Sequence, residues 1–217
     1  MKNNIIAVAN WKGGCGKTLV SALLCHYLRL KEIPVMAIDA DVQQSLFRQR
    51  MFELQGSPDA VVPWELQYLD TSDVDGVREQ MKALKELPSC VVVDCPGNIT
   101  DSGMVPVYEA ADIIVVPFTY DFVNVDATFR FAQTVREVSR ARFIFVPNRI
   151  NLNEEKGEDL EEARKQAVGL LKEYGWVTPR IKQSKVARKY RTIKGLDYYQ
   201  RKLVEHPFDD IVERLKK

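Results

Sequence analysis

A glycine-rich loop between an apolar run and a helical pattern constrains this chain more than any other feature. Residues 12–18 read Lys-Gly-Gly-Cys-Gly-Lys-Thr, the apolar run 5–9 precedes them, and a helical pattern begins at Thr18. Strand, loop and helix in this order are the context in which backbone N–H groups bind the phosphates of a nucleotide. The loop therefore predicts a phosphate-binding site on an α/β fold.

Each residue type in the loop has an expected contact. The side chain of Lys17 is expected to reach the β- and γ-phosphates, and the Thr18 hydroxyl is expected to bind Mg²⁺. The usual pattern GxxxxGK[ST] is not met, because Trp11 occupies its first glycine position. The predicted nucleotide contacts of the loop are Lys12, Gly13, Gly14, Cys15, Gly16, Lys17, Thr18 and Leu19.

Composition limits the class of protein and of partner. The chain has 217 residues and a formal net charge of +1, so any nucleic-acid or membrane partner must be met by a local patch. Its 4 cysteines are scattered without a CxxC pair, which predicts free thiols and disfavours an iron–sulfur or zinc site. No apolar run approaches the roughly 18 residues that span a bilayer. With a strand expected from about residue 4, there is no room for a signal peptide, and we expect a cytoplasmic protein.

Short apolar runs alternate with longer amphipathic stretches along the chain. Strands are expected at 5–9, 34–38, 64–69 (an edge strand), 90–93, 112–117 and 142–146. Helices are expected at 18–31, 44–54, 73–87, 103–110, 125–139, 158–174 and 197–216, with a polar loop at 151–157. This alternation implies βαβ units, and runs that are apolar throughout suit a sheet covered on both faces. We expect one α/β domain over 1–217, with helices on both faces of a mostly parallel sheet.

Acidic residues follow two of the predicted strands. Asp39 and Asp94 stand where these strands end, and Asp41 lies two residues beyond Asp39. The carboxyl ends of parallel strands are where ligands bind in open α/β sheets, and Mg²⁺ takes oxygen ligands and retains several waters. We therefore expect Asp39 and Asp94 to complete the Mg²⁺ site of Thr18 by holding the waters that the ion retains. Asp41 is then free to orient an attacking water.

These motifs together resemble the ParA/MinD group of deviant-Walker P-loop ATPases. Residues 12–18 match the signature loop of that group, and residues 39–45 resemble its Asp-x-Asp-Pro-Gln-x-Ser segment. Residues 91–96 resemble its Walker B segment. Asn148 resembles an asparagine that touches the adenine base in relatives, and Pro179 resembles a second base-side contact more weakly. The resemblance implies a P-loop NTPase fold.

The resemblance also implies a mechanism. Two subunits would hold two ATP molecules face to face, and Lys12 would reach the phosphates of the partner's ATP as an arginine finger does. ATP would drive this dimerisation, hydrolysis would be slow and would reverse it, and Asp41 would support hydrolysis. Three residues depart from the family pattern: Leu19 replaces a threonine, Val42 replaces a proline, and Trp11 is bulky beside the expected dimer face.

A run of basic residues is the local exception in a nearly neutral chain. No acidic residue interrupts it, and its members are Arg180, Lys182, Lys185, Arg188, Lys189, Arg191 and Lys194. Such a cluster suits phosphate contacts that carry no sequence information. Relatives of the ParA type bind DNA non-specifically through this part of the chain, and a ParB-like, cargo-bound partner activates their ATPase. A solvated surface, or a role beside the adenine base, remains an alternative for these residues.

Other interpretations lead to different functions. The chain could be a polar or membrane-associated positioning scaffold whose nucleotide-dependent dimer is the output. The tail 208–217 carries Asp209, Asp210 and Glu213, which anionic lipid would repel, so we expect its helix to pack on the sheet. A ligase of the dethiobiotin synthetase type is disfavoured by Lys12. The interpretation that we favour is a partition ATPase that positions DNA or other cargo and is associated with the nucleoid.

Overall fold

The computed structural model describes residues 4–97, 102–151 and 158–216. Its strands are β1 (Ile5–Val8), β2 (Val35–Asp39), β3 (Glu65–Tyr68), β4 (Cys90–Asp94), β5 (Ile113–Phe118), β6 (Arg142–Pro147) and β7 (Gly175–Val177). Its helices are α1 (Lys17–Leu30), α2 (Ser45–Gly56), α3 (Val74–Lys85), α4 (Met104–Ala110), α5 (Phe122–Val138), α6 (Glu158–Lys172) and α7 (Tyr198–Leu215). A short 3₁₀ helix, η1, covers Ala187–Lys189.

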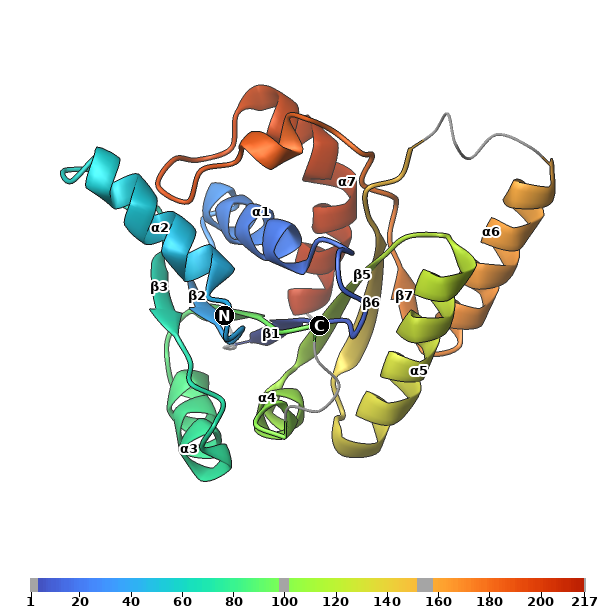
Figure 1. Ribbon diagram of the computed structural model, residues 1–217, viewed down its shortest axis with the longest axis horizontal. Coiled ribbons are helices and arrows are strands. Elements are labelled where there is room, and N and C mark those ends of the chain that lie inside the picture. The colour runs from blue at the N-terminus through green and yellow to red at the C-terminus, as the bar shows by residue number, and fades with distance from the viewer. Residues whose placement is uncertain (1–3, 98–101, 152–157, 217) are drawn as a thin grey trace.

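All 7 strands belong to one sheet in the order β3-β2-β4-β1-β5-β6-β7. Each pair of neighbouring strands is parallel, so all strands end at the same edge of the sheet. The central strand β1 lies between β4 and β5 and leads directly into the glycine-rich loop (Figure 1). The register places Asp39 beside Asp94, which brings the two acidic strand ends together as expected.

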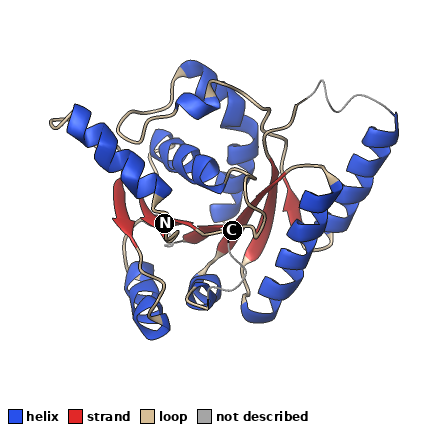
Figure 2. Ribbon diagram, in the orientation of Figure 1, coloured by secondary structure: helices blue, strands red, loops and turns tan. Residues whose placement is uncertain are grey.

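Alternate residues of the strands enter two separate cores. Ile5 and Ala7 face the core formed with α3, α4, α5 and α6, whereas Ile6 and Val8 face the core formed with α1 and α7. Figure 2 shows these helices above and below the sheet. Because both faces are covered, the central strands β1, β4 and β5 are buried along their whole length, and the expected three-layer α/β fold is confirmed.

The tail helix and the cysteines also follow their predictions. Helix α7 buries Val204, Phe208 and Ile211 in the core that it shares with α1, so it packs on the sheet. All 4 cysteines are buried, and none of them forms a disulfide. No helix within the described residues is long and apolar enough to cross a membrane.

Two elements differ from the expectation. The sequence predicts no strand at β7, but Gly175 lets the chain approach β6 so closely that a Cβ there would lie 2.3 Å from the Phe143 carbonyl oxygen. Helix α5 begins three residues before the expected Val125, because the Asp121 side chain caps it by accepting a hydrogen bond from the Asn124 N–H at 3.0 Å. The polar loop expected at 151–157 lies largely outside the described residues.

Candidate nucleotide and magnesium site

The glycine-rich loop joins β1 to α1 through two left-handed residues. Gly14 has φ of +79° and Gly16 has φ of +90°, conformations that favour glycine. Gly16 is the N-cap of α1, and no side chain caps the helix. The first N–H groups of α1 therefore keep their capacity to bind an anion, and the helix dipole favours one there.

Asn148, directly after β6, supports this loop from behind. Its side chain is buried, and its Nδ2 donates a hydrogen bond to the Cys15 carbonyl at 2.8 Å. A Cβ on Gly16 would lie 2.5 Å from the same nitrogen, so only glycine fits. The structure thus assigns the Asn148 amide to the loop backbone, a role that we did not predict. The contact of Asn148 with an adenine base stays a prediction.

The loop forms one wall of an open cavity of about 700 Å³. Residues after β2 and β4 form the other walls. The lining residues are Gly13, Gly14, Gly16, Lys17, Thr18, Leu19, Asp41, Val42, Gln43, Ser45, Pro96, Gly97 and Arg149. The cavity therefore unites the three segments that the sequence singled out, and it has the size of a small-molecule site.

Lys17 places a cation inside this cavity. Its side chain is mostly buried, and a Cβ on Gly97 would lie 3.1 Å from the Lys17 Nζ. The ammonium therefore lies against the loop that follows β4. An ammonium at a helix N-terminus is suited to bind phosphate oxygens, as expected for this residue.

Asp94 is one of two buried acids of the site. Its Oδ1 accepts a hydrogen bond from the Ser21 hydroxyl at 2.9 Å, while its Oδ2 is buried without a partner in the part of the chain that the structure describes. Burial raises the pKa of Asp94 to about 7, and the nearby Thr18 hydroxyl lowers it in part. A carboxylate oxygen left without a donor, close to a threonine hydroxyl, fits Mg²⁺ or a water that Mg²⁺ holds.

Both oxygens of the Asp39 carboxylate already accept hydrogen bonds from the backbone. Its Oδ1 accepts a hydrogen bond from the Asp41 N–H at 3.1 Å, and its Oδ2 accepts one from the Phe47 N–H at 2.9 Å. Burial raises the pKa of Asp39, and these donors lower it in part. Asp39 thus shapes the turn that leads into α2. Its part in binding Mg²⁺ stays a prediction. In that role the Asp39 carboxylate would also have to keep its hydrogen bonds to the backbone of this turn.

Asp41 lines the cavity. Its Oδ1 accepts a hydrogen bond from the Gln43 N–H at 2.9 Å, and Gln44 follows with φ of +52° before α2 starts. This turn also brings Gln43 and Ser45 to the cavity wall, a contact that was not predicted. The position suits a residue that orients water beside a phosphate, and the catalytic role of Asp41 stays a prediction.

Lys12 lies outside the wall of its own cavity. The backbone around it is fixed: its N–H donates to Asn10 Oδ1 at 3.1 Å and its carbonyl accepts from the Cys15 thiol at 3.2 Å. The neighbouring Trp11 ring packs edge-on against Phe131, with 5.5 Å between ring centroids. The Trp11 side chain, which we expect beside a dimer face, therefore also packs against the core.

Arg149 is a cavity residue that the sequence did not single out. It has φ of +58°, and its Nη1 donates a hydrogen bond to the Gly14 carbonyl. It also lines the cavity, so the cavity wall has a second basic residue besides Lys17. The sequence feature that could have identified Arg149 is its position directly after Asn148, at the end of a predicted strand.

The basic run lies in the segment between β7 and α7, near α1 and α2 in Figure 1. All seven of its side chains are exposed: Arg180, Lys182, Lys185, Arg188, Lys189, Arg191 and Lys194. The segment is anchored by buried Ile181, Ala187 and Thr192. Pro179 is exposed at its start, and the contact of Pro179 with a base stays a prediction.

Within the described residues, no three His, Cys, Asp or Glu side chains group into a metal site.

Known proteins share this fold. McdA from Cyanothece, also solved in an ATP complex, matches with a TM-score of 0.76 and 18% identity, covering 98% of this chain and 99% of McdA. MinD from Aquifex aeolicus matches with a TM-score of 0.75 and 16% identity over 99% of this chain and 98% of MinD. A plasmid partition protein from Borrelia burgdorferi matches with a TM-score of 0.72 and 16% identity over 99% of this chain and 100% of that protein.

The relatives found by sequence match over a shorter stretch than these structures do, but with higher identity. A protein named as a candidate replication protein A from Sinorhizobium fredii is 46% identical over 59 residues, which is 26% of this chain and 14% of that protein. The match therefore spans only a small part of the curated relative's length. The family described as the CobQ/CobB/MinD/ParA nucleotide binding domain matches residues 6–189. This match extends over more than half of the sequence, and the chain belongs to that family.

Proposed function

We propose that this chain is a slow ATPase that dimerises when it binds ATP and then holds non-specific DNA, so that DNA or another cargo is partitioned or positioned. The observation that carries the proposal is that the two lysines of the loop lie in different positions relative to the phosphate cavity. Lys17 lines the phosphate cavity, whereas Lys12 does not. The Lys12 ammonium, outside the cavity of its own subunit, would be placed to contact the phosphates bound by a second subunit.

Different residues of the cavity would bind the phosphates, hold Mg²⁺ and orient the water. The N–H groups at the start of α1 and the Lys17 ammonium hold the phosphates, and Arg149 adds positive charge at the same cavity. Asp94 and the Thr18 hydroxyl would hold Mg²⁺, which supplies positive charge that neutralises phosphate oxygens when bound. Asp41 would orient the water, and Lys12 of a partner subunit would complete the site.

The exposed basic run supports DNA as the surface on which the switch acts. Contacts from flexible basic side chains to phosphates supply non-specific affinity that depends strongly on salt. The name of one similar protein, a plasmid partition protein, agrees with this choice. A ParB-like or other cargo-bound partner would accelerate hydrolysis, and the protein would be found on the nucleoid.

The test is binding to a labelled random-sequence DNA duplex, followed by fluorescence anisotropy with ATP, with ADP and without nucleotide. We expect tight binding only with ATP, weakening as salt rises. Replacing Arg188 and Lys189 by Gln should lower the slope of log affinity against log salt by about one for each phosphate that is no longer neutralised.

The matched control replaces two exposed lysines outside the basic run, Lys82 and Lys172, by Gln. Its net charge change equals that of the test variant, and its DNA binding should stay close to that of the unchanged protein. Equal binding in ADP would contradict the proposed switch. Absence of DNA binding in every nucleotide state, with dimerisation retained, would instead favour the positioning scaffold.

A further inference from the structure

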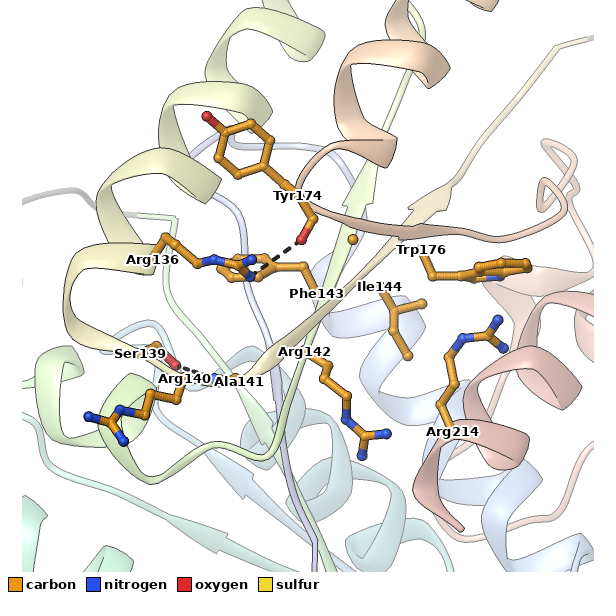
Figure 3. A pocket seen from close by; sticks show the side chains of 11 residues that line it. Arg136, Ser139, Arg140, Ala141, Arg142, Phe143, Ile144, Tyr174, Trp176 and Arg214 are labelled. Atoms are coloured by element: carbon orange, nitrogen blue, oxygen red, sulfur yellow. Dashed lines mark hydrogen bonds between the residues drawn. The ribbon is translucent and has the colours of Figure 1, made fainter. Parts of the chain in front are cut away.

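A second cavity, of about 690 Å³, lies at the amino ends of β6 and β7. It is therefore at the opposite edge of the sheet from the phosphate loop. Its walls come from the end of α5, the start of β6, the strand β7 and the last turns of α7 (Figure 3). We call it the arginine cavity, because Arg136, Arg140, Arg142 and Arg214 line it.

The arginine cavity has an unbalanced charge. None of its lining residues is an aspartate or glutamate. Among the side chains that the structure describes, no carboxylate forms an ion pair with any of the four guanidinium groups. In a chain with a net charge of only +1, this concentration of unneutralised positive charge is a local feature that favours an anionic ligand.

Two of the arginines are held in place by aromatic rings. The Arg214 guanidinium lies over the Trp176 ring at 3.8 Å, and its Nη1 donates a hydrogen bond to the Asp210 carbonyl at 2.8 Å. The Trp176 Nε1 donates to Asp210 Oδ2 at 2.8 Å, which fixes the ring. Arg136 lies over the Phe143 ring and donates to the Tyr174 carbonyl. A guanidinium that is already oriented loses less freedom when it binds an oxyanion.

The cavity also has apolar surface between its charges. Ala141, Phe143 and Ile144 line it beside the arginines, and Trp176 is 48% exposed. In Figure 3, Arg142 extends from the start of β6 on the same side as Arg214, whereas Arg140 points the other way. A ligand for this cavity therefore needs negative groups that flank an apolar one.

We propose that the arginine cavity binds an acidic segment of a partner protein, with carboxylates on Arg142 and Arg214 and an apolar side chain against the floor between them. A DNA duplex presents a convex, uniformly charged backbone that does not fill a concave, partly apolar cavity. A single strand would bind by stacking its bases, but Arg214 already covers one face of Trp176. This surface is separate from the nucleotide site, so the proposal does not depend on the proposed ATPase.

The probe is a short fluorescein-labelled peptide in which Glu alternates with Leu, titrated with the full chain and followed by fluorescence anisotropy at low salt. The comparison peptide has Gln in place of every Glu. We expect the acidic peptide alone to bind, and Arg142→Gln to weaken binding about fivefold. Arg142 is exposed at a strand end, so this change should leave the melting temperature unaltered.

Arg29→Gln is the matched control, because Arg29 is an exposed arginine at the end of α1, outside the cavity. It should bind the acidic peptide as the unchanged protein does. Lys17→Ala should also bind normally, which separates this result from any failure of the nucleotide site. Equal binding of the Gln peptide, unchanged binding by Arg142→Gln, or displacement of the peptide by a single-stranded DNA oligonucleotide would overturn the proposal.

Discussion

The Glu53 carboxylate on α2 accepts hydrogen bonds from both the backbone N–H and the hydroxyl of Thr192, each at 2.7 Å. Arg50, one turn earlier on α2, donates to the Thr192 carbonyl and hydroxyl, each at 2.9 Å. Two side chains of α2 thus bind every polar group of Thr192, which lies between Arg191 and Lys194 of the basic run. Because Ser45 at the start of α2 lines the phosphate cavity, one helix contacts both the nucleotide site and the basic segment.

Replacing Glu53 by Ala should strongly destabilise the protein. The change leaves the Thr192 N–H and hydroxyl without their acceptor, and it removes a negative charge that stabilises the charged form of buried Arg50. We expect the free energy of unfolding to fall by about 3 kcal/mol. Urea denaturation measures this, with exposed Gln55→Ala on the same helix as the control. A decrease equal to that of the control would show that the interaction contributes nothing.

His26 should make stability depend on pH. It is buried, its Nε2–H donates to the Arg191 carbonyl at 2.8 Å, and its Nδ1 accepts from Trp64 Nε1 at 3.2 Å. Burial lowers the pKa of His26 to about 4, from an ordinary value of 6.5. Between these two pH values the unfolded chain binds the proton and the folded protein does not. The contribution of His26 to stability should therefore fall by about 3 kcal/mol as the pH drops through this window, while the raised pKa of Asp94 acts in the opposite direction.

Urea denaturation across that pH range measures the effect. The stability of the unchanged protein minus that of His26→Gln should fall by the same amount across this range, and replacement of the exposed His206 by Gln is the control. These are the only 2 histidines of the chain, so each variant is the control for the other. A pH profile that is the same for both variants would contradict the role of His26.

Gly16→Ala should damage the phosphate loop. The residue has φ of +90°, and the new Cβ would lie 2.5 Å from Asn148 Nδ2. We expect stability to fall by about 2 kcal/mol and nucleotide binding to disappear. Gly169→Ala is the matched change in α6, where nothing lies within 4 Å of the added carbon. It should raise stability by about 0.5–1 kcal/mol, so opposite signs are expected in thermal denaturation.

Variants of the loop lysines and of Asp41 should separate binding, dimerisation and turnover. Lys17→Ala should abolish ATP binding, because it removes the cation inside the cavity. Asp41→Ala should bind ATP and dimerise but turn over about a hundredfold more slowly, or slower still. Lys12→Ala should bind ATP while its turnover falls by about a thousandfold. Equilibrium dialysis measures ATP binding, sedimentation measures dimerisation, and phosphate release measures turnover.

Normal turnover in Asp41→Ala would contradict the role proposed for that residue.

The sheet was predictable because most of its strands are apolar runs of four residues or more, ended by polar or turn residues. β1, β4 and β5 show this pattern directly, and Asp73 signals the start of α3, where its side chain caps the helix. β7 has only 3 residues, too few to show a period. It becomes a strand because Gly175 can approach Phe143, which is a tertiary contact.

Within the candidate site, residue types were predictable and partners were not. The loop and Asp94 follow from motif spacing. The bond from Asn148 to the Cys15 carbonyl depends on the end of β6 lying behind the loop, and local sequence does not report that distance. The arginine cavity was missed for the same reason, since α5, β6 and α7 each supply arginines that are far apart in the sequence.

The central position of β1 predicts where the molecule opens last. Its amides are paired between β4 and β5, whereas β3 and β7 each have only one neighbouring strand. In hydrogen exchange, the β1 amides should therefore exchange only through global unfolding, while those of the two edge strands should exchange by local opening. Protection of β1 should then be the same with and without nucleotide when global stability is held equal. The loop that follows β1 is thus attached to the most persistent part of the protein, which gives the bound phosphates a fixed base.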